Sequence, residues 1–446
     1  MNILAKLRTR ISAETAAVFL AAAFGVALRV WCVYNVPTKQ VFDFATFHEL
    51  ARNIFEGRGH TLDGAPMAWT GPAYPYALAL FFRLCGNAAE ITGKWFNVIL
   101  SSATLVPAYF VYKKLLKGRK AAAAFVITAL FPHYIAYCNV LGTEVFFVFL
   151  FMSLLFVQLY FPDKKAAWPV LGVLCAALAL TKPFMLAYPV ICACVRRTES
   201  GGVKKTLAFF GVVFVSMLIV ISPWTYRNYR LFGRIIPVSY NMGYNMYVNG
   251  NASNTTGGWM DPAKVEKPAW VEEEMNAILR NGERSVKVAY DIEPLMRSEA
   301  LKWIKGNPLE FAKLGLLRVQ QTFFSGANDI SLWAANEAVV YSPDSGRTEA
   351  DFTRAKNTAE FLLNAVALTL NVFGIMFFFL KFKGYAAAFF ATRLKLGALD
   401  GVVFINTAFF LVVTFFFEGQ ARYAYPSYIF MIAAFMEICA GTVKKG

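Results

Sequence analysis

The sequence predicts an all-α polytopic membrane protein with about ten transmembrane helices, and three observations support this. Of its 446 residues, 57% are apolar and only 16% are charged, whereas soluble chains carry about 25% charged residues. The mean hydropathy is +0.47. The apolar stretches are continuous, as in EVFFVFLFMSLLFV (144–157), and do not alternate as the strands of a membrane β-barrel do. Helices are the remaining structure that satisfies its backbone in lipid.

The apolar stretches define the expected spans and their order. They cover residues 14–33, 89–112, 119–138, 145–161, 168–181, 183–195, 206–224, 359–380, 399–417 and 425–441. The first resembles a signal peptide, but no small-residue cleavage site precedes Trp31, so we expect a retained span. Residues 168–195 form either one long tilted span or two short ones bent at Lys182–Pro183. We favour two, because two spans return the basic residues 196–197 to the side of the N-terminus.

The net charge of +16 indicates topology rather than a nucleic-acid partner. Lys and Arg are concentrated in the short connections on the side of the N-terminus, as in KKLLKGRK (113–120). The only acids in all of these connections are Asp163 and Glu199. By the positive-inside rule, both termini face the cytoplasm. We therefore expect a multi-pass protein of the cell (inner) membrane with its larger loops on the periplasmic or extracellular side.

This map divides the chain into three parts. Residues 1–224 form an N-terminal transmembrane catalytic module that includes the exterior loop 34–88. Residues 225–358 are polar, with nearly balanced charges, and predict a small, mostly helical exterior domain. Residues 359–446 supply the C-terminal transmembrane helices.

The first exterior loop contains two expected interfacial helices. In VFDFATFHELARNIFEGRGH (41–60), apolar residues recur every three or four positions, which is typical of an amphipathic helix lying along a membrane surface. Gly57 and Gly59 end this helix. A second helix follows in GPAYPYALALFFRL (71–84), with Pro72 and Pro75 at its start.

Two acids are placed at matching depths on the exterior side. Asp43 stands directly before the first turn of the amphipathic helix, where it can act as an N-cap or as a general base. Glu144 stands at the start of the fourth span. It either caps that helix or faces a polar cavity, because a carboxylate in hydrocarbon is costly.

Four basic residues lie on the same side: Lys182, Arg227, Arg230 and Arg422. Each alone could be an interfacial anchor whose charge reaches water. Together with the two acids, they predict a site that handles an anion.

Several strings of the chain resemble one enzyme family. They are VFDFATFHELARNIFEGRGH, TGPAYPYALALFF, LGTEVFFVFLF, LALTKPFMLAYPV, SPWTYRNYRLFGRIIPVSYNMGYNMYVNGN and ARYAYP. In order and sidedness they resemble membrane glycosyltransferases of the GT-C class, closest to glycosyltransferase family 39, relatives of protein O-mannosyltransferases and the lipid A aminoarabinose transferase. The resemblance covers residues 1–250 and 400–446.

The resemblance implies the GT-C fold and transfer of a sugar from a polyprenyl-phosphate carrier to a hydroxyl or phosphate of an acceptor. Asp43 matches the family's essential carboxylate, and Glu144 corresponds to a second functional acid. Some relatives carry two adjacent acids in the first loop, but here Asp43 lies between two phenylalanines. The family's Arg-Pro after the fifth span is Lys182–Pro183 here, which weakens the expectation of a bidentate phosphate clamp.

The residues favour a lipid-linked donor independently. The sequence has no Gly-rich phosphate loop, dinucleotide fingerprint or Asp-x-Asp metal motif. We expect the donor phosphate to bind Lys182, Arg227, Arg230 and Arg422, and Asp43 to deprotonate the acceptor with inversion at the anomeric carbon. A divalent ion between Asp43 and Glu144 stays open, since the three histidines form no zinc motif.

Contacts to the sugar or acceptor are expected from side chains of the exterior segments: His48, Glu49, Tyr74, Tyr244 and Tyr423. The acceptor is a lipid, a glycan or a protein. Asn251-Ala-Ser and Asn254-Thr-Thr are possible glycosylation sequons. Alternative functions are a flippase or transporter of a lipid-linked sugar, with the acids as gating groups, and an O-antigen ligase or polymerase.

Overall fold

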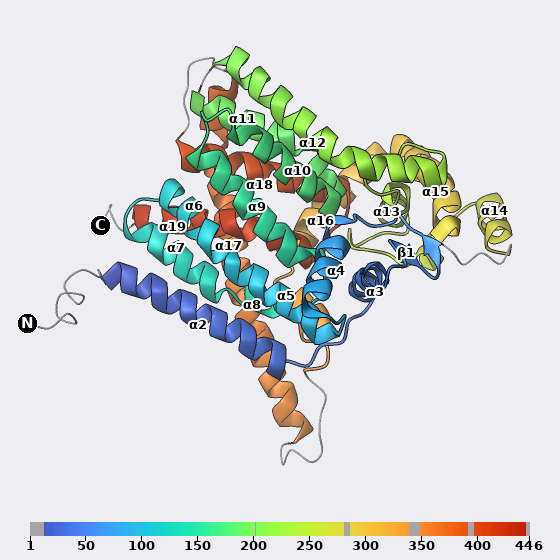
Figure 1. The fold of residues 1–446 in the computed structure, drawn as a ribbon, viewed down its shortest axis with the longest axis horizontal. Helices are drawn as coiled ribbons and strands as arrows, with labels where there is room; N and C mark the ends of the chain where they lie inside the picture. The colour runs from blue at the N-terminus through green and yellow to red at the C-terminus, as the bar shows by residue number, and fades with distance from the viewer. Residues whose placement is uncertain (1–12, 201, 281–285, 339–347, 391–396, 443–446) are drawn as a thin grey trace, which may run out of the picture.

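The computed structural model describes residues 13–200, 202–280, 286–338, 348–390 and 397–442. Long helices form one bundle, and shorter helices gather at one end of it (Figure 1). Six helices of the described residues are long and apolar enough to cross a membrane, or seven if one bent pair counts as a single span. The helical membrane fold is therefore confirmed, and the count of ten spans stays a prediction.

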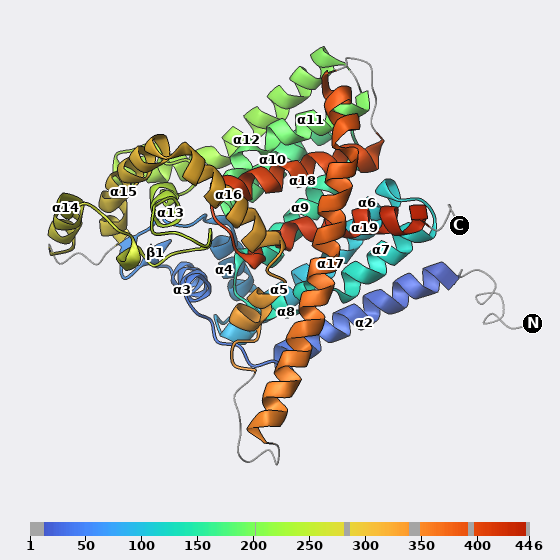
Figure 2. The same ribbon diagram turned by 180° about the vertical axis from the view of Figure 1, so that it is seen from behind.

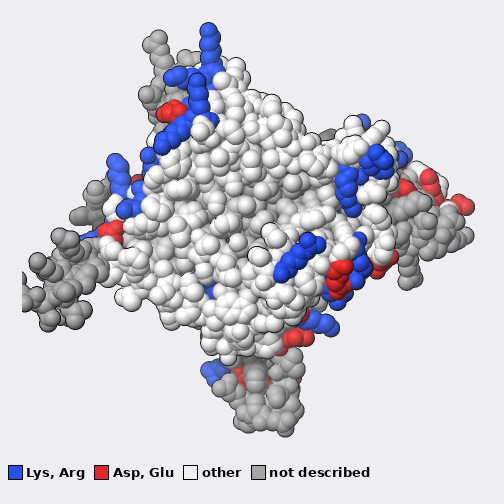
Figure 3. Space-filling view, in the orientation of Figure 1, with Lys and Arg blue, Asp and Glu red and all other residues white. Residues whose placement is uncertain are grey.

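The first half of the bundle follows the expected order. Its helices are α2 (Ala13–Asn35), α5 (Glu90–Ala103), α6 (Leu105–Leu115), α7 (Arg119–Leu130), α8 (Pro132–Ala136), α9 (Thr143–Tyr160), α10 (Ala167–Thr181), α11 (Tyr188–Ser200) and α12 (Val203–Phe232). The broad face in Figure 3 is almost free of charge, and Lys and Arg project at its left and upper edges. Large apolar side chains such as Phe19, Leu20 and Ile219 are 66–70% exposed, as expected of a lipid-facing surface.

The chain breaks at Lys182–Pro183, as the sequence predicts. Helix α10 ends at Thr181, a 3-10 turn covers Pro183–Ala187, and α11 begins at Tyr188. Proline at the first position of the turn has no N–H to continue the helix. The break leaves the Lys182 side chain at the end of a span rather than inside one.

A second break separates α7 from the following helical turns, which are bent by 43°. Pro132 begins α8, so a backbone carbonyl near the end of α7 needs another donor. The buried guanidinium of Arg29 supplies it, with Nη1 2.8 Å from the Ala129 carbonyl and Nε 2.8 Å from the Ser101 hydroxyl. Arg29 thereby joins α2 to α5 and α7.

The first exterior loop contains α3 (Asp43–Phe55), a two-stranded antiparallel hairpin and α4 (Ala73–Cys85). The hairpin strands are β1 (Thr61–Leu62) and β2 (Ala65–Pro66). Both expected amphipathic helices are present, and α3 and α4 pack together through Phe47, Tyr74 and Phe82.

The second half begins with exterior helices and returns to the bundle. Its elements are α13 (Met242–Asn249), α14 (Ala269–Arg280), α15 (Val286–Gly306), α16 (Pro308–Phe323), a π-helical turn (Ile330–Ala334), α17 (Glu349–Phe390), α18 (Ala398–Phe416), a 3-10 segment (Ala421–Ser427) and α19 (Tyr428–Thr442). Seen from behind, α17 crosses the whole bundle, and α13 and α15 lie at the same end of the molecule as α3, with α14 furthest out (Figure 2). The expected part boundaries fall inside α12 and α17, so they do not coincide with helix ends.

The start of α2 and the end of α19 lie at the same end of the bundle, and α3 lies at the opposite end (Figure 1). The placement of both ends of the chain on the cytoplasmic side stays a prediction.

Candidate functional site

Four of the charged residues expected at the site form two ion pairs at the end of the bundle where α3 lies. Arg422 Nη2 lies 3.2 Å from Asp43 Oδ2, and Lys182 Nζ lies 3.3 Å from Glu144 Oε1. The ring of Tyr423 joins the pairs, because its centroid is 5.8 Å from Lys182 Nζ and 5.3 Å from the Arg422 guanidinium carbon. We call these five residues the paired-charge cluster.

Asp43 is the first residue of α3, and the residue at the N-cap position is Phe42. The N-cap prediction is therefore wrong, because the carboxylate points to Arg422 instead. The preceding Phe42 has φ +48°, a backbone conformation that costs about 1–3 kcal/mol for a residue with a side chain. The Asp43 side chain is 54% exposed, so it is open to an incoming molecule.

Glu144 lies in the first turn of α9 and is buried. It makes no capping hydrogen bond, so its expected cap role is also not supported. Its Oε2 has no hydrogen-bond partner among the described residues. A methyl group at Gly142 would lie 2.6 Å from Oε2 and 2.7 Å from the Phe44 ring, so a glycine is required at the entry to this helix.

Arg422 lies in the 3-10 segment between α18 and α19 and is surrounded by aromatic rings. Its guanidinium carbon is 5.7 Å from the Phe44 centroid and 5.8 Å from the Trp333 centroid. Burial lowers the pKa of Arg422, but Tyr423, Asp43 and nearby glutamates outweigh it and raise that pKa well above its ordinary value. Arg422 is therefore a permanent, well-positioned cation.

A further acid, Glu418, lies in the same loop and was not predicted. It accepts a hydrogen bond from the Tyr423 hydroxyl at 3.2 Å and another from the Gln420 amide. Burial raises the pKa of the Glu418 carboxyl, although Arg422 and these two donors oppose the shift. Its position four residues before Arg422, in FFFEGQARYAYP, is the sequence signal that could have found it.

Arg227 and Arg230 have other partners. Arg227 donates to the carbonyls of Met67 (2.8 Å) and His60 (3.1 Å) and lies 4.4 Å from the Trp224 ring. Arg230 donates to the Tyr226 hydroxyl at 3.2 Å. Arg227 therefore holds the hairpin of the first exterior loop, and these contacts do not support the prediction that both arginines bind the donor phosphate.

The expected sugar contacts are spread over the exterior elements. Burial raises the pKa of the Tyr244 hydroxyl, and a hydrogen bond with Trp259 opposes this shift. The charges of Glu418 and Asp43 raise the pKa further. Tyr74 is fully buried between α3 and α4. His48 contacts the Ala88 carbonyl at 2.9 Å, and Glu49 is half-buried beside it on α3. Their roles toward substrate stay predictions.

The two sequons are structural. The buried amide of Asn251 donates to the carbonyls of Tyr247 and Val248, and that of Asn254 donates to Gly258. A glycan on either nitrogen would break these bonds, so the structure does not support modification there.

A divalent ion between Asp43 and Glu144 does not fit this arrangement. Each of these carboxylates already faces a cation, and a metal ion between them would be repelled by Arg422 and Lys182. In the part of the chain that the structure describes, no three His, Cys, Asp or Glu side chains are grouped as a metal site. The divalent ion that the sequence left open is not confirmed, and we derive no step through one.

Comparison with known proteins identifies the fold. Residues 69–226 match the family described as dolichyl-phosphate-mannose-protein mannosyltransferase. The matched segment contains Glu144 and Lys182 but not Asp43 or Arg422. No curated protein sequence gives a significant match.

Solved structures of an oligosaccharyltransferase from Archaeoglobus fulgidus are similar over nearly the whole chain. One is tethered to an acceptor peptide containing the NVT sequon (13% identity, TM-score 0.54), with 97% of this chain and 50% of that chain covered. Another, named AglB, is in complex with an inhibitory peptide and a dolichol-phosphate (14% identity, TM-score 0.53, 97% and 50% covered). A third is in complex with Zn and sulfate (14% identity, TM-score 0.52, 96% and 49% covered). The chain spans about half the length of these structures.

The predicted GT-C fold is therefore confirmed, and so is the resemblance to family 39 in the matched segment. Together, the matched segment, the shared fold and the long apolar helices indicate a membrane protein whose fold is similar to that of these oligosaccharyltransferase structures.

Proposed function

We propose that this chain transfers a sugar from a polyprenyl-phosphate-linked donor to a hydroxyl or phosphate of an acceptor, with inversion of the anomeric carbon. The observation that carries the proposal is the pairing of a half-exposed carboxylate, Asp43, with a mostly buried cation, Arg422, 3.2 Å away. A single displacement at a glycosyl phosphate needs a base on the acceptor side of the anomeric carbon and a cation near the departing phosphate, and the cluster supplies both groups.

The proposed reaction is a single displacement at the anomeric carbon. An oxygen of the acceptor attacks the anomeric carbon as Asp43 accepts its proton. The bond between that carbon and the phosphate oxygen breaks, and its electron pair leaves with the polyprenyl phosphate. The departing phosphate gains negative charge, which Arg422 and Lys182 stabilise. The product is a glycoside of inverted configuration and a free polyprenyl phosphate.

Each cation of the cluster is held by a carboxylate before substrate binds. A donor phosphate that approaches Arg422 competes with Asp43 for the same guanidinium. As Arg422 turns to the phosphate, the Asp43 carboxylate loses its ion-pair partner and can accept a hydrogen bond from the acceptor instead. Donor binding would thus prepare the base for the acceptor.

The proposed donor and its site are consistent with the membrane location. Glu144 lies where α9 begins and Lys182 where α10 ends, both beside the first exterior loop, so a phosphate can bind there while its prenyl tail lies among apolar helices. We place this end of the bundle on the exterior side, in line with the Lys and Arg of short connections at the other end, such as KKLLKGRK (113–120).

The test compares the full chain with its Asp43→Asn variant, and Asp63→Asn is the matched control, because Asp63 is an exposed acid of the same loop. Labelled polyprenyl-phosphate monosaccharides are the donors, and membranes from cells lacking the gene supply the acceptor. We expect Asp43→Asn to slow transfer at least ~100-fold and to keep binding of polyprenyl phosphate, with Asp63→Asn unchanged. Movement of the lipid-linked sugar across the membrane of vesicles, without cleavage of its sugar–phosphate bond, would show a flippase instead.

A further inference from the structure

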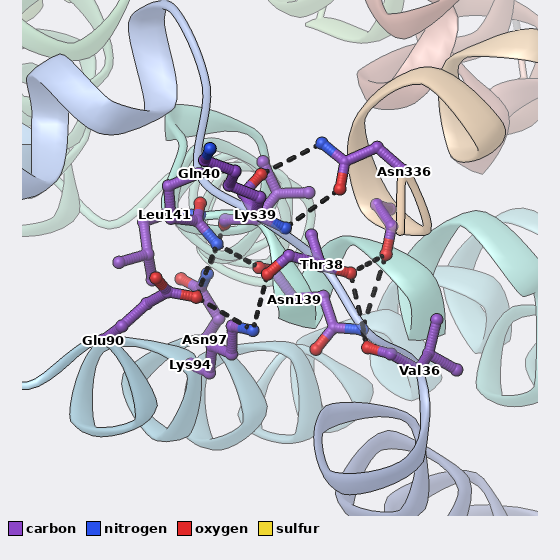
Figure 4. A network of polar contacts seen from close by, with 12 residues as sticks. Val36, Thr38, Lys39, Gln40, Glu90, Lys94, Asn97, Asn139, Leu141 and Asn336 are labelled. Carbon is purple, nitrogen blue, oxygen red and sulfur yellow. Dashed lines mark hydrogen bonds and ion pairs between the residues drawn. The ribbon is translucent and has the colours of Figure 1, made fainter. Parts of the chain in front are cut away.

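The two segments that lead into the acids of the cluster are bonded to each other. Residues 36–42 precede Asp43, and residues 139–143 precede Glu144. Figure 4 shows Gln40 and Leu141 from these segments facing each other, with Glu90 and Lys94 of α5 below them. The segments come from positions about a hundred residues apart in the chain.

The side chain of Gln40 makes the central contacts. Its Oε1 accepts a hydrogen bond from the Leu141 N–H at 2.8 Å, and its Nε2 donates to the Asn139 carbonyl at 2.8 Å. A primary amide that uses both its acceptor and its donor on one backbone segment fixes that segment in distance and direction. No other side chain among the described residues makes two such bonds to the backbone of residues 139–141.

The environment of Gln40 supports this geometry. Its Nε2 also lies 3.3 Å from Glu90 Oε1, which is in turn 3.0 Å from Lys94 Nζ. Lys94 Nζ donates to the Thr38 carbonyl at 3.3 Å. The buried Asn139 amide donates to the Val36 carbonyl at 3.1 Å. Hydrogen bonds therefore join residues 36–42 both to residues 139–143 and to helix α5.

Gln40 and Leu141 each lie three residues before an acid of the cluster. Between Gln40 and Asp43 the chain passes through Phe42, which has φ +48°. Between Leu141 and Glu144 it passes through Gly142, where a side chain would clash with Phe44 and with Glu144 itself. Both short connections are thus sterically restricted, and a displacement at the Gln40–Leu141 contact passes directly to the carboxylates.

We propose that Gln40 is a positioning residue that sets the separation of Asp43 and Glu144, and with it the alignment of base and phosphate-binding cations. This inference rests on the proposed function for its consequence in catalysis. The bond network itself does not depend on it. Gln40 touches neither acid, so its effect passes through the backbone of residues 40–43 and 141–144.

The proposal requires a control that breaks bonds in the same segment without reaching Leu141. Asn336 provides it, because its Nδ2 donates to the Lys39 carbonyl at 3.0 Å and its Oδ1 accepts from the Lys39 N–H at 2.9 Å. Asn336→Ala thus removes two hydrogen bonds next to Gln40, whereas Gln40→Ala removes two to the backbone of residues 139–141 and one to Glu90. A merely structural role predicts the same result for both variants.

Two measurements on the full chain in detergent test the proposal. The first is amide hydrogen exchange of the peptide that contains Leu141, whose N–H is bonded to Gln40. We expect exchange to accelerate about tenfold in Gln40→Ala and to stay at the wild-type rate in Asn336→Ala. Gln40→Glu keeps the acceptor for Leu141 but loses the donor to Asn139, so its exchange rate should lie between these two.

The second measurement is the split between kcat and the donor KM, with the labelled polyprenyl-phosphate monosaccharide that the wild type uses. A misalignment of about 1 Å costs about 100-fold in rate, so we expect kcat of Gln40→Ala to fall about 10- to 100-fold, with the donor KM changed less than ~3-fold and Asn336→Ala near wild type.

Unchanged exchange and unchanged kcat in Gln40→Ala would overturn the proposal, as would an equal loss of kcat in Asn336→Ala. If the wild type uses none of the donors, the proposed function fails, and the exchange experiment still decides whether Gln40 holds Leu141.

Discussion

The carboxylate of Asp43 accepts a hydrogen bond at 3.2 Å from the guanidinium of Arg422, which follows it by 379 residues in the chain. The bond joins the first exterior loop to the connection between the last two helices. Because the Asp43 side chain is half exposed, the pair contributes at most about 1 kcal/mol to stability. We infer that its importance lies in placing a base beside a cation.

Replacement of Arg422 by Gln should remove the main cation of the cluster. We expect transfer to fall about 10²- to 10³-fold, because the departing phosphate loses a preorganised charge, and Arg422→Lys should recover only part, since ammonium lacks the planar fork. Steady-state transfer assays measure this. Arg354→Gln, on the exposed start of α17, is the control, and equal losses in both variants would contradict the assignment.

The Glu144–Lys182 pair should be coupled in stability. Lys182→Met leaves the buried Glu144 carboxylate without its cation, and we expect a loss of about 3–5 kcal/mol. The double variant Glu144→Gln, Lys182→Met should be less destabilised than the sum of the single variants, because it leaves no uncompensated charge. Denaturation in detergent measures the three free energies of unfolding. Strict additivity would show that the two groups do not interact.

Gly142→Ala should distort the entry to α9, because the added methyl group would meet Glu144 Oε2 and the Phe44 ring. We expect a destabilisation of about 1–3 kcal/mol together with a loss of transfer. The matched control is Gly211→Ala in α12, where nothing lies within 4 Å of the added atom and a helical alanine should stabilise by about 0.5–1 kcal/mol. A fully active Gly142→Ala protein would refute the close packing at this site.

His60 should make the protein less stable in acid. Burial, and then the charge of Arg227, lowers its pKa from 6.5 to about 3, so the folded state holds it neutral. Between these values the unfolded state binds more protons, and the stability present above pH 6.5 is lost as pH falls. The loss should be about 2 kcal/mol at pH 5. The difference in Tm between pH 7.5 and pH 5 should shrink in His60→Gln, and an unchanged difference would contradict this.

The features that the sequence predicted correctly are local ones. Continuous apolar runs predicted the helices, Pro183 predicted the break after α10, and the three- and four-residue spacing predicted α3. Periodicity and helix-breaking residues act within a few positions, so no knowledge of the rest of the chain is needed. The expected depth of Asp43 and Glu144 in the membrane is also a local feature, because it follows from where the neighbouring spans end.

The missed features depend on contacts between distant segments. Trp333 covers Arg422, and Gln40 holds Leu141, but neither residue is unusual in its own segment. Arg227 is a different case, because its position at a span end indicated a phosphate ligand while the structure shows it bonded to carbonyls of the first loop; its role toward phosphate stays a prediction. A sequence gives the depth of a charge more readily than its partner.

The bond between Asp43 and Arg422 also constrains biosynthesis. Arg422 is added to the growing chain 379 residues after Asp43. A truncated product that ends before residue 422 contains the carboxylate without its cation, even if its helices have inserted. The paired-charge cluster can therefore assemble only after residue 422 has been translated.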